Sequence, residues 1–276
     1  MADALRILVV FPHPDDSAFF AAGTLARWVA EGHHVTSICV TSGNLGTMRP
    51  DQTPEQVAAA RQGQLRAANA VLGVQETVAL GYPDGGFIEP AALRKDLVGL
   101  VRRYRPDRLM TLDPWLRYEV HPDHDLVGRM AAEAAAFAAF PLLHPEQLTG
   151  EVQPHSPSGV WLMGTLGRRP NCYVDISRTI DVKVAAALEF QDTLTILARM
   201  FAPEIDPADV SPHQRDTLAR HADTWLRSMA GRIGKAAGLE AAEAFFVERC
   251  LPGHFDNMDR AIGEMLGEDD PPPTVI

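Results

Sequence analysis

The stretch that decides the fold is "RILVVFPHPDDSAFF", residues 6–20. Its apolar run ends at Phe11, and His13, Asp15 and Asp16 follow the next proline before apolar residues resume. A continuous apolar run of this kind is typical of a parallel strand that is covered on both faces. Adjacent carboxylates repel each other, and burying them is costly unless solvent, a cation or a metal ion compensates. The stretch therefore predicts a buried strand that ends at a polar loop whose negative charge needs a partner.

Apolar runs and amphipathic segments alternate from this stretch onward. Later runs that predict strands are 34–41, 76–80, 108–113, 159–165 and 171–177. Segments with helical spacing are 19–33, 54–73, 90–106 and 125–140. This alternation predicts an α/β fold with a Rossmann-like, mostly parallel sheet flanked by helices. After about residue 178 the pattern becomes mainly helical. We expect a single domain over residues 1–266 and a disordered acidic, proline-rich tail over 267–276.

Two polar loops of similar composition follow predicted strands, "HPDD" at 13–16 and "HPDH" at 121–124. Ligands of parallel sheets bind beyond the carboxyl ends of the strands, so the two loops should meet at one edge. Imidazole and carboxylate ligands suit zinc, and a catalytic zinc site has three protein ligands and a water. His13 and Asp16 can share an ion because residues three apart project from one side of a helix. His124 can supply the third ligand. The sequence therefore predicts a Zn²⁺ site, although another divalent metal would suit the same donors.

Three further side chains of these loops lie beside the predicted ion without binding it. Asp15 could accept a proton from water, and His121 could donate a hydrogen bond or a proton on the other side of a carbonyl. Asp123 could hold His121 in the required tautomer or keep it protonated. A bound ion lowers the pKa of water toward about 7 and polarises a carbonyl oxygen. Together these groups predict an amide hydrolase, whereas either loop alone is more often a solvated helix start.

The pairing of "PHPDD" with "HPDH" resembles the LmbE-like, or PIG-L-type, family of zinc-dependent N-acetylglucosaminyl deacetylases. The resemblance covers most of the chain and includes "LGYPDG", "PDRLMTLDPW" and "YVDISRTIDVKVAAAL". The segments "DPWLRYEVHPDH" and "PNCYVDIS" most resemble the diacetylchitobiose deacetylase branch. The resemblance implies a hydrolase that removes the acetyl group from an N-acetylglucosamine-type amino sugar or conjugate. It would cleave a linear, non-peptide C–N amide bond and release acetate and a free amine.

The resemblance also implies roles for individual residues. It gives the six residues of the two loops the roles derived above: metal ligands His13, Asp16 and His124, and catalytic residues Asp15, His121 and Asp123. Arg61 matches an arginine that contacts substrate, and Asp84 an acid that holds sugar hydroxyls. As bare residues, Arg61 is more often a surface charge on a helix and Asp84 a turn former.

Three weaker candidates for substrate binding come from position and side-chain type. Tyr118 could reach the oxyanion, and Trp115 could stack on a sugar face. For Tyr118 a packed loop aromatic is the commoner role, and Trp115 could instead anchor the loop. His254 could enter a neighbouring subunit's site if the protein is a homo-oligomer, and related enzymes often form trimers or hexamers. Two departures from the family pattern concern specificity, since Ser17 and Gln64 stand where many members carry Glu.

Composition limits the partners. The 276 residues carry a formal net charge of -11, which argues against non-specific binding to nucleic acid or an anionic membrane. The three cysteines are widely spaced, which fits a reducing cytoplasm. No apolar stretch approaches the roughly 18 residues of a membrane span. Two alternatives remain: a nucleotide-binding α/β enzyme, disfavoured because "PHPDDS" lacks a glycine-rich turn, and a catalytically silent metal-binding protein of the same fold.

Overall fold

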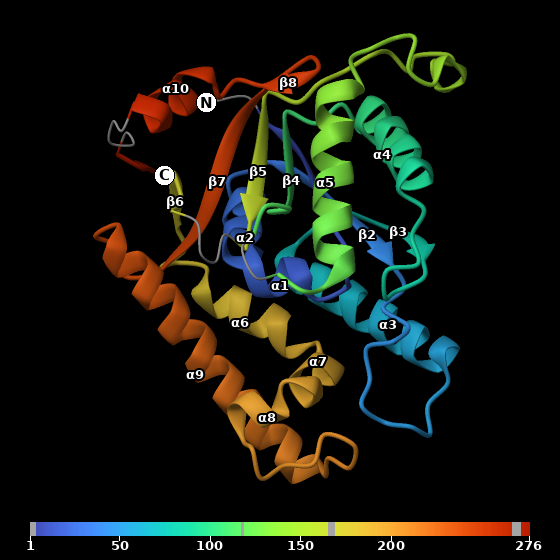
Figure 1. The fold of residues 1–276 in the computed structure, drawn as a ribbon. Coiled ribbons are helices and arrows are strands. Elements are labelled where there is room, and N and C mark those ends of the chain that lie inside the picture. The colour runs from blue at the N-terminus through green and yellow to red at the C-terminus, as the bar shows by residue number, and fades with distance from the viewer. Residues whose placement is uncertain (1–3, 117–118, 165–168, 267–271) are drawn as a thin grey trace.

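A nine-stranded, mostly parallel sheet forms the centre of the computed structural model, which describes residues 4–116, 119–164, 169–266 and 272–276. Five parallel strands lie in the order β3-β2-β1-β4-β5. They are β1 (Arg6–Phe11), β2 (His34–Thr41), β3 (Glu76–Tyr82), β4 (Arg108–Leu112) and β5 (Gly159–Met163). Helices flank the sheet in Figure 1. The α/β fold predicted from the sequence is confirmed.

Each face of the sheet is covered by its own helices (Figure 1). Alternate residues of β1 point to opposite faces: Val9 belongs to one buried apolar cluster and Val10 to the other. The first cluster includes side chains of α2 (Ala22–Ala30), α3 (Pro54–Leu72) and α6 (Ile180–Leu188). The second includes α4 (Pro90–Tyr104) and α5 (Pro122–Phe137). Burial on both faces explains why the parallel strands read as continuous apolar runs.

The C-terminal half contributes more to the sheet than its sequence predicts. β7 (Ala242–Leu251) lies between β5 and β6 (Cys172–Asp175) and pairs antiparallel with both. The expectation of a mainly helical C-terminal part misses this strand, because "AEAFFVERCL" is rich in the helix formers Ala and Glu. Its position between two strands, buried along most of its length, overrides that local preference.

The last residues also differ from expectation. β9 (Thr274–Val275) pairs parallel with β6, so the prediction of a disordered tail is wrong for the described residues 272–276. The free edge of β6 offers unpaired backbone N–H and C=O groups, and these supply the partners that an isolated tail would lack. The rest of the predicted tail, residues 267–271, lies outside the described residues.

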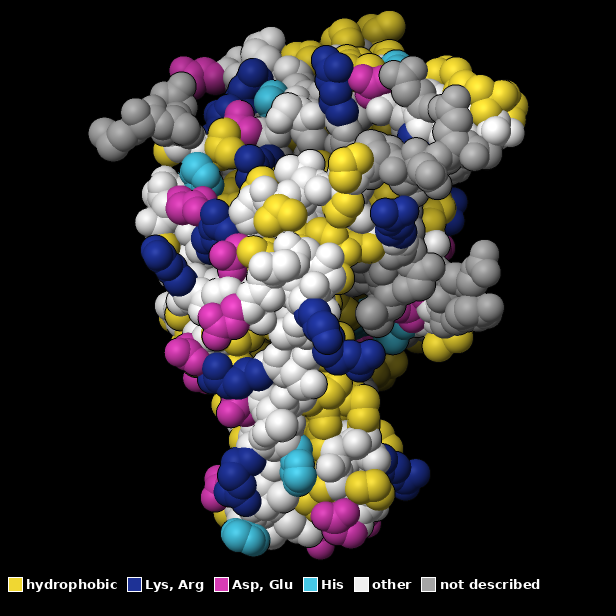
Figure 2. Space-filling view, turned by 90° about the vertical axis from the view of Figure 1, so that its left-hand side faces the viewer, with side chains coloured by type: hydrophobic (Ala, Val, Ile, Leu, Met, Phe, Trp, Pro, Cys, Tyr) yellow, Lys and Arg dark blue, Asp and Glu magenta, His cyan; other side chains and the backbone are white. Residues whose placement is uncertain are grey.

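Three helices of the C-terminal half form a lobe below the carboxyl ends of the strands (Figure 1). They are α7 (Gln191–Ile196), α8 (Ala198–Phe201) and α9 (Pro212–Ala236). On the face seen in Figure 2, basic and acidic side chains are interspersed over this lobe and the body above it. A hairpin strand β8 (His254–Phe255), α10 (Met258–Leu266) and a short 3-10 helix (Pro145–Gln147) complete the elements. Within the described residues, no helix has the length and apolar character that crossing a bilayer requires.

The two motif loops open helices at the carboxyl edge of the sheet. α1 (Asp16–Phe20) begins inside "HPDD", and α5 begins at Pro122 with His121 as its N-cap. The sequence predicts that this second helix starts three residues later. In the structure, "HPDH" therefore belongs to the N-cap and first turn of the helix. Proline is favoured at a first helical position, where its missing N–H costs nothing. The side chains of the motif are therefore fixed by helical geometry.

A buried ion pair ties the first motif helix to the C-terminal half. The Glu243 carboxylate of β7 accepts hydrogen bonds from the N–H groups of Gly23 and Thr24, at 3.0 and 2.8 Å, in the first turn of α2. It also accepts from Lys183 Nζ at 2.6 Å, and this ammonium donates to the Phe19 carbonyl of α1 at 2.7 Å. Glu243 and Lys183 are both buried. The pair therefore connects β7 and α6 to the end of α1.

Removing one partner of this pair should destabilise the fold. We expect Glu243→Ala to lower the free energy of unfolding by about 3 to 5 kcal/mol, because the Lys183 charge is left buried and uncompensated. Arg249→Ala, which deletes an exposed charge on the same strand, should cost less than about 1 kcal/mol. Urea denaturation of both variants measures the difference. Equal losses would contradict the role given to the buried pair.

Candidate active site

The two motif loops bring three predicted ligands together at the carboxyl edge of the sheet. His13 Nδ1 lies 3.2 Å from His124 Nε2 and 3.4 Å from Asp16 Oδ2. His124 Nε2 lies 3.5 Å from the other carboxylate oxygen of Asp16, Oδ1. A tetrahedral zinc ion with ligands at 2.0–2.1 Å needs donor atoms about 3.3 to 3.4 Å apart. The two histidine nitrogens have nearly this spacing, and Asp16 approaches each of them with a different oxygen, so the three side chains converge on one place.

Both histidines present their second ring nitrogen to a carboxylate. His13 Nε2 lies 3.2 Å from Asp123 Oδ2 and 3.2 Å from Asp84 Oδ1. His124 Nδ1 lies 3.0 Å from Glu119 Oε2. Metal-binding histidines are usually held in this way, because the carboxylate accepts the outer N–H and leaves the inner nitrogen free to bind the ion. The arrangement occurs twice at this site.

The carboxylates around His13 require positive charge among them. Burial lowers the pKa of His13, but hydrogen bonds to Asp123, Asp16 and Asp84 outweigh burial and raise this pKa to about 12. Burial would raise the pKa of Asp16, but the His13 imidazole lowers it. Carboxylates concentrated around one buried imidazole are stable only with positive charge among them. The raised pKa of His13 favours a proton in this role, and a divalent ion bound to the same atoms would displace that proton.

His121 is the third imidazole of the cluster. Its ring stacks on His124 with centroids 4.8 Å apart and meets His13 edge-on at 4.3 Å. Burial and then the neighbouring His13 and His124 lower its pKa, which favours the neutral ring. Its Nδ1 accepts the Asp123 backbone N–H at 3.3 Å, which puts the proton on Nε2. Ring nitrogens of the three histidines lie within 4.8 Å of one another, so a ligand set that includes His121 is a geometric alternative.

Asp123 serves a different histidine from the one expected. The sequence pairs it with His121, but its Oδ2 lies 3.9 Å from His121 Nδ1 and 3.2 Å from His13 Nε2. Its two oxygens also accept the N–H groups of Gly85 and Gly86, each at 2.8 Å. Burial opposes ionisation, yet the hydrogen bonds from His13 and these glycines hold the pKa of Asp123 well below its usual range. The first turn of α5 thus directs the Asp123 carboxylate toward His13 and toward Gly85 and Gly86, the glycine loop. His121 Nδ1 lies farther from it.

Asp15 has its hydrogen-bond partners outside the cluster of His13, Asp16 and His124. Its Oδ1 accepts from Arg61 Nη2 at 2.6 Å, and its Oδ2 accepts from the Thr193 hydroxyl at 2.6 Å. Arg61 also donates to Thr193 through Nη1 at 3.1 Å. Asp15 is therefore a fixed carboxylate beside the donor cluster, whereas its neighbour Asp16 points at the histidines.

Comparison with known proteins decides the family. Residues 8–135 match PIG-L, described as GlcNAc-PI de-N-acetylase. Diacetylchitobiose deacetylase from Thermococcus kodakarensis is 33% identical over 253 residues, covering 92% of this chain and 85% of the relative. The chain belongs to the PIG-L, or LmbE-like, family.

Two further relatives support this assignment. A crystal structure described as N,N'-diacetylchitobiose deacetylase from Pyrococcus horikoshii aligns with a TM-score of 0.75 at 28% identity, covering 90% of this chain and 85% of that one. A 1D-myo-inositol 2-acetamido-2-deoxy-alpha-D-glucopyranoside deacetylase from Streptomyces avermitilis is 36% identical over 166 residues, or 51% of this chain and 56% of the relative. These PIG-L relatives are deacetylases of N-acetylglucosamine-type substrates. The resemblance identified from the sequence is confirmed.

The residues predicted to contact substrate lie in different surroundings. Arg61 is 3% exposed and bound to Asp15, and Asp84 is buried against His13, so both have partners inside the protein. Trp115 is half exposed, with its indole perpendicular to Phe255 at a centroid distance of 6.4 Å. The predicted substrate contacts of these residues stay predictions.

Of the two other candidates, only His254 lies among the described residues. His254 lies on the exposed hairpin strand β8, and no hydrogen bond or ion pair joins it to the cluster among the residues that are described. Its predicted place in a neighbouring subunit's site stays a prediction. Tyr118 lies outside the described residues.

Sequence reasoning missed two functional candidates, Glu119 and Thr193. Glu119 lies five residues before His124, and its position in "YEVHPDH" was the available signal. Its carboxylate also accepts the His121 backbone N–H at 2.8 Å. Thr193 lies far along the chain in a segment without a motif, so only the fold brings it to Asp15.

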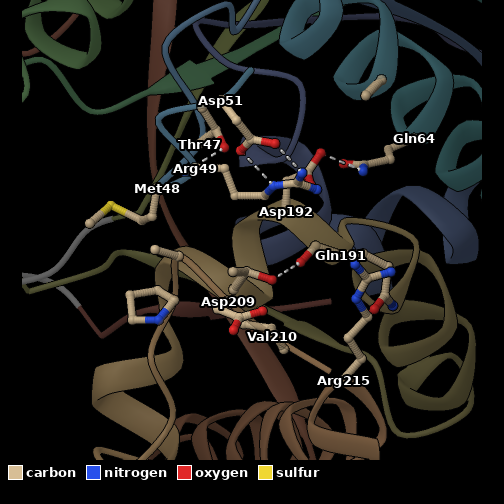
Figure 3. A pocket seen from close by; sticks show the side chains of 14 residues that line it. Thr47, Met48, Arg49, Asp51, Gln64, Gln191, Asp192, Asp209, Val210 and Arg215 are labelled. Carbon is tan, nitrogen blue, oxygen red and sulfur yellow. Dashed lines mark hydrogen bonds and ion pairs between the residues drawn. The ribbon is translucent and has the colours of Figure 1, made fainter. Parts of the chain in front are cut away.

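A polar pocket of about 500 Å³ lies beyond Arg61 and Thr193, between α3, the loop after β2 and the helical lobe. Figure 3 shows the Gln64 amide of α3 reaching Asp192 of α7, with Arg215 of α9 on the opposite wall. Gln64 Nε2 donates to Asp192 Oδ2 at 2.8 Å. A Glu at this position, as in many PIG-L proteins, would place two carboxylates together. Gln64, which differs from the Glu of the family pattern, thus has a hydrogen-bond partner in the lobe.

The glycine loop offers a test of how Asp123 is held. Gly86 has a φ of +85°, and a Cβ there would lie 3.1 Å from Pro122 Cγ. Gly81 has a comparable φ of +74° with nothing within 4 Å of its Cβ position. Gly81→Ala should cost roughly 1–2 kcal/mol of unfolding free energy from backbone strain alone. Gly86→Ala should cost more because the loop must also move off α5, and equal losses in urea denaturation would contradict this.

Proposed function

We propose that this protein is a metal-dependent hydrolase that removes the acetyl group from an N-acetylglucosamine-type amino sugar or conjugate. Membership of the PIG-L family supports the reaction, since the deacetylases compared above act on substrates of this kind. The observation that carries the proposal is the pair of histidines, His13 and His124, each turned by an outer carboxylate toward one point shared with Asp16.

We assign the metal ligands to His13, Asp16 and His124. The alternative set with His121 in place of Asp16 is less favourable, because the His121 side chain is 40% exposed whereas Asp16 is buried. Oxygen from Asp16 and nitrogen from two histidines suit zinc. A divalent ion held there would act as a Lewis acid that polarises the amide carbonyl and makes water more acidic.

The remaining residues divide the proton transfers. Asp15 accepts the proton of the water that attacks the acetyl carbon, and Arg61 and Thr193 hold its carboxylate in place. The neutral His121 donates its Nε2 proton as a hydrogen bond to the carbonyl oxygen while negative charge develops there. When the C–N bond breaks, the nitrogen takes the proton that Asp15 received. The hydroxyl of the water thus ends in acetate, and its proton ends on the free amine.

Several expectations stay predictions. Zinc is the proposed metal, and the cytoplasm is the proposed location. A homo-oligomer, trimeric or hexameric, is the proposed assembly. Acetate release from chitobiose-type, glucosaminyl-inositol and glucosaminyl-malate substrates tests the reaction and separates the substrate classes. Release from none of them by the metal-loaded protein would refute the proposed function.

Asp15→Asn tests the assignment of the base. The amide keeps the size of the side chain but cannot accept the proton at neutral pH, so we expect turnover to fall by about 10²–10⁴-fold. Metal content should be unchanged, because Asp15 is not among the proposed ligands. Steady-state acetate release with metal analysis on the same samples measures both. Full activity would rule out Asp15 as the base.

Glu119→Gln tests the carboxylate that holds His124. An amide in its place has no negative charge to attract the outer N–H of His124, so the metal dissociation constant should rise by about 10- to 100-fold. Asp125→Asn is the matched control, since it removes an exposed charge one residue after His124 that pairs only with Arg129 among the described residues. Competition with a fluorescent zinc chelator measures both affinities. A control that weakens binding as much as Glu119→Gln would show a general charge effect.

A further inference from the structure

We propose that Thr193 is a positioning residue for the reaction, and that its hydroxyl fixes the orientation of the Asp15 carboxylate. The inference rests on the proposed role of Asp15 as the base. Thr193 lies on α7, far along the chain from both motifs, and no motif of the sequence points to it. The contact links the helical lobe directly to the proposed chemistry.

Three side chains form a closed set of hydrogen bonds. Thr193 Oγ1 and Arg61 Nη2 each lie 2.6 Å from a different oxygen of Asp15. Arg61 Nη1 lies 3.1 Å from Thr193 Oγ1. A guanidinium can only donate, so the hydroxyl accepts from Arg61 and spends its single proton on Asp15. The direction of every bond in the set is therefore fixed.

The surroundings leave these groups little freedom. Thr193 is 7% exposed and Arg61 is 3% exposed. Gly46 packs on the guanidinium so closely that a Cβ there would lie 2.8 Å from Arg61 Nε. A β-branched side chain such as threonine is also stiff about χ1. Support at both oxygens from rigid, buried groups prevents rotation of the Asp15 carboxylate.

α7 is itself anchored to the sheet side of the molecule. Gln64 of α3 donates to Asp192, the residue before Thr193, at 2.8 Å. Phe190 and Leu194, which flank this pair, are buried. The adjacent residues Asp192 and Thr193 thus contact the same helix, α3, one through Gln64 and the other through Arg61. This double contact sets the position of the hydroxyl.

Loss of the hydroxyl should affect turnover and not substrate binding. Valine has the shape of threonine but cannot donate, so one oxygen of Asp15 would face an apolar methyl group and the carboxylate would turn. A hydrogen bond to a charged group of this kind corresponds to about 10- to 100-fold in rate. We expect kcat of Thr193→Val to fall by that factor with KM within about twofold of the parent.

Two variants complete the kinetic test. Thr193→Ser restores the donor and should recover kcat to within about threefold of the parent. Thr224→Val is the matched control in the same helical lobe: Thr224 is exposed on α9, its Oγ1 donates to the Arg220 carbonyl at 3.0 Å, and it lies outside the pocket lining, so kcat should be unchanged. A Thr193→Val variant with parental kcat, or a Thr193→Ser variant as slow as Thr193→Val, would overturn the proposal. If the valine variant does not fold, Thr193→Ala replaces it in the comparison with serine.

Crystal structures of the zinc-loaded parent and Thr193 variants give a readout that does not depend on activity. The Asp15 carboxylate should keep its orientation in Thr193→Ser and rotate in Thr193→Val, or in Thr193→Ala where that replaces it. An unmoved carboxylate in the variant without the hydroxyl overturns the positioning role even if the parent is inactive. A parent that deacetylates none of the substrates refutes the proposed function, whereas the orientation of Asp15 still decides the role of Thr193.

Discussion

Three carboxylates converge on the buried imidazole of His13, and the rest of the site depends on this contact. Asp16 lies at its inner nitrogen, and Asp84 and Asp123 lie at its outer nitrogen. Each carboxylate comes from a different loop or helix start. The ring can therefore be held only when the ends of β1 and β3 and the start of α5 lie close together. The negative charge requires a cation at the centre, and the inner nitrogens of the histidines face the place where an ion would lie.

The fold supplies this convergence by ordinary means. Parallel strands end at one edge, helices begin there, and their first turns aim the motif side chains inward. The C-terminal half then stabilises what the N-terminal half builds. Glu243 fixes the end of α1 and the start of α2, while α7 brings Thr193 to Asp15. A site whose motifs lie in the first half of the chain is thus completed by residues from the second.

Local patterns predicted the parallel strands and the long helices, because burial on both faces and helix capping leave clear traces in sequence. The end of α3 at Gly73, with a φ of +73°, is one such case. The strand β7 could not be predicted from "AEAFFVERCL", since its place between β5 and β6 is a long-range property. The closeness of the proposed ligands His13, Asp16 and His124 followed from spacing, but the partners of Asp123, Asp84 and Arg61 did not. Those partners depend on which loops lie opposite, and spacing along the chain carries no such information.

The central claim is that His13, Asp16 and His124 together hold one catalytic ion. The most direct measurement is a crystal structure of the zinc-loaded protein with diffraction data collected on both sides of the zinc absorption edge. We predict one anomalous peak per chain at bonding distance from His13 Nδ1, His124 Nε2 and an Asp16 oxygen, with Asp15 still bound to Arg61 and Thr193. A peak bonded to His121 in place of Asp16, or no peak within the cluster, would contradict the account.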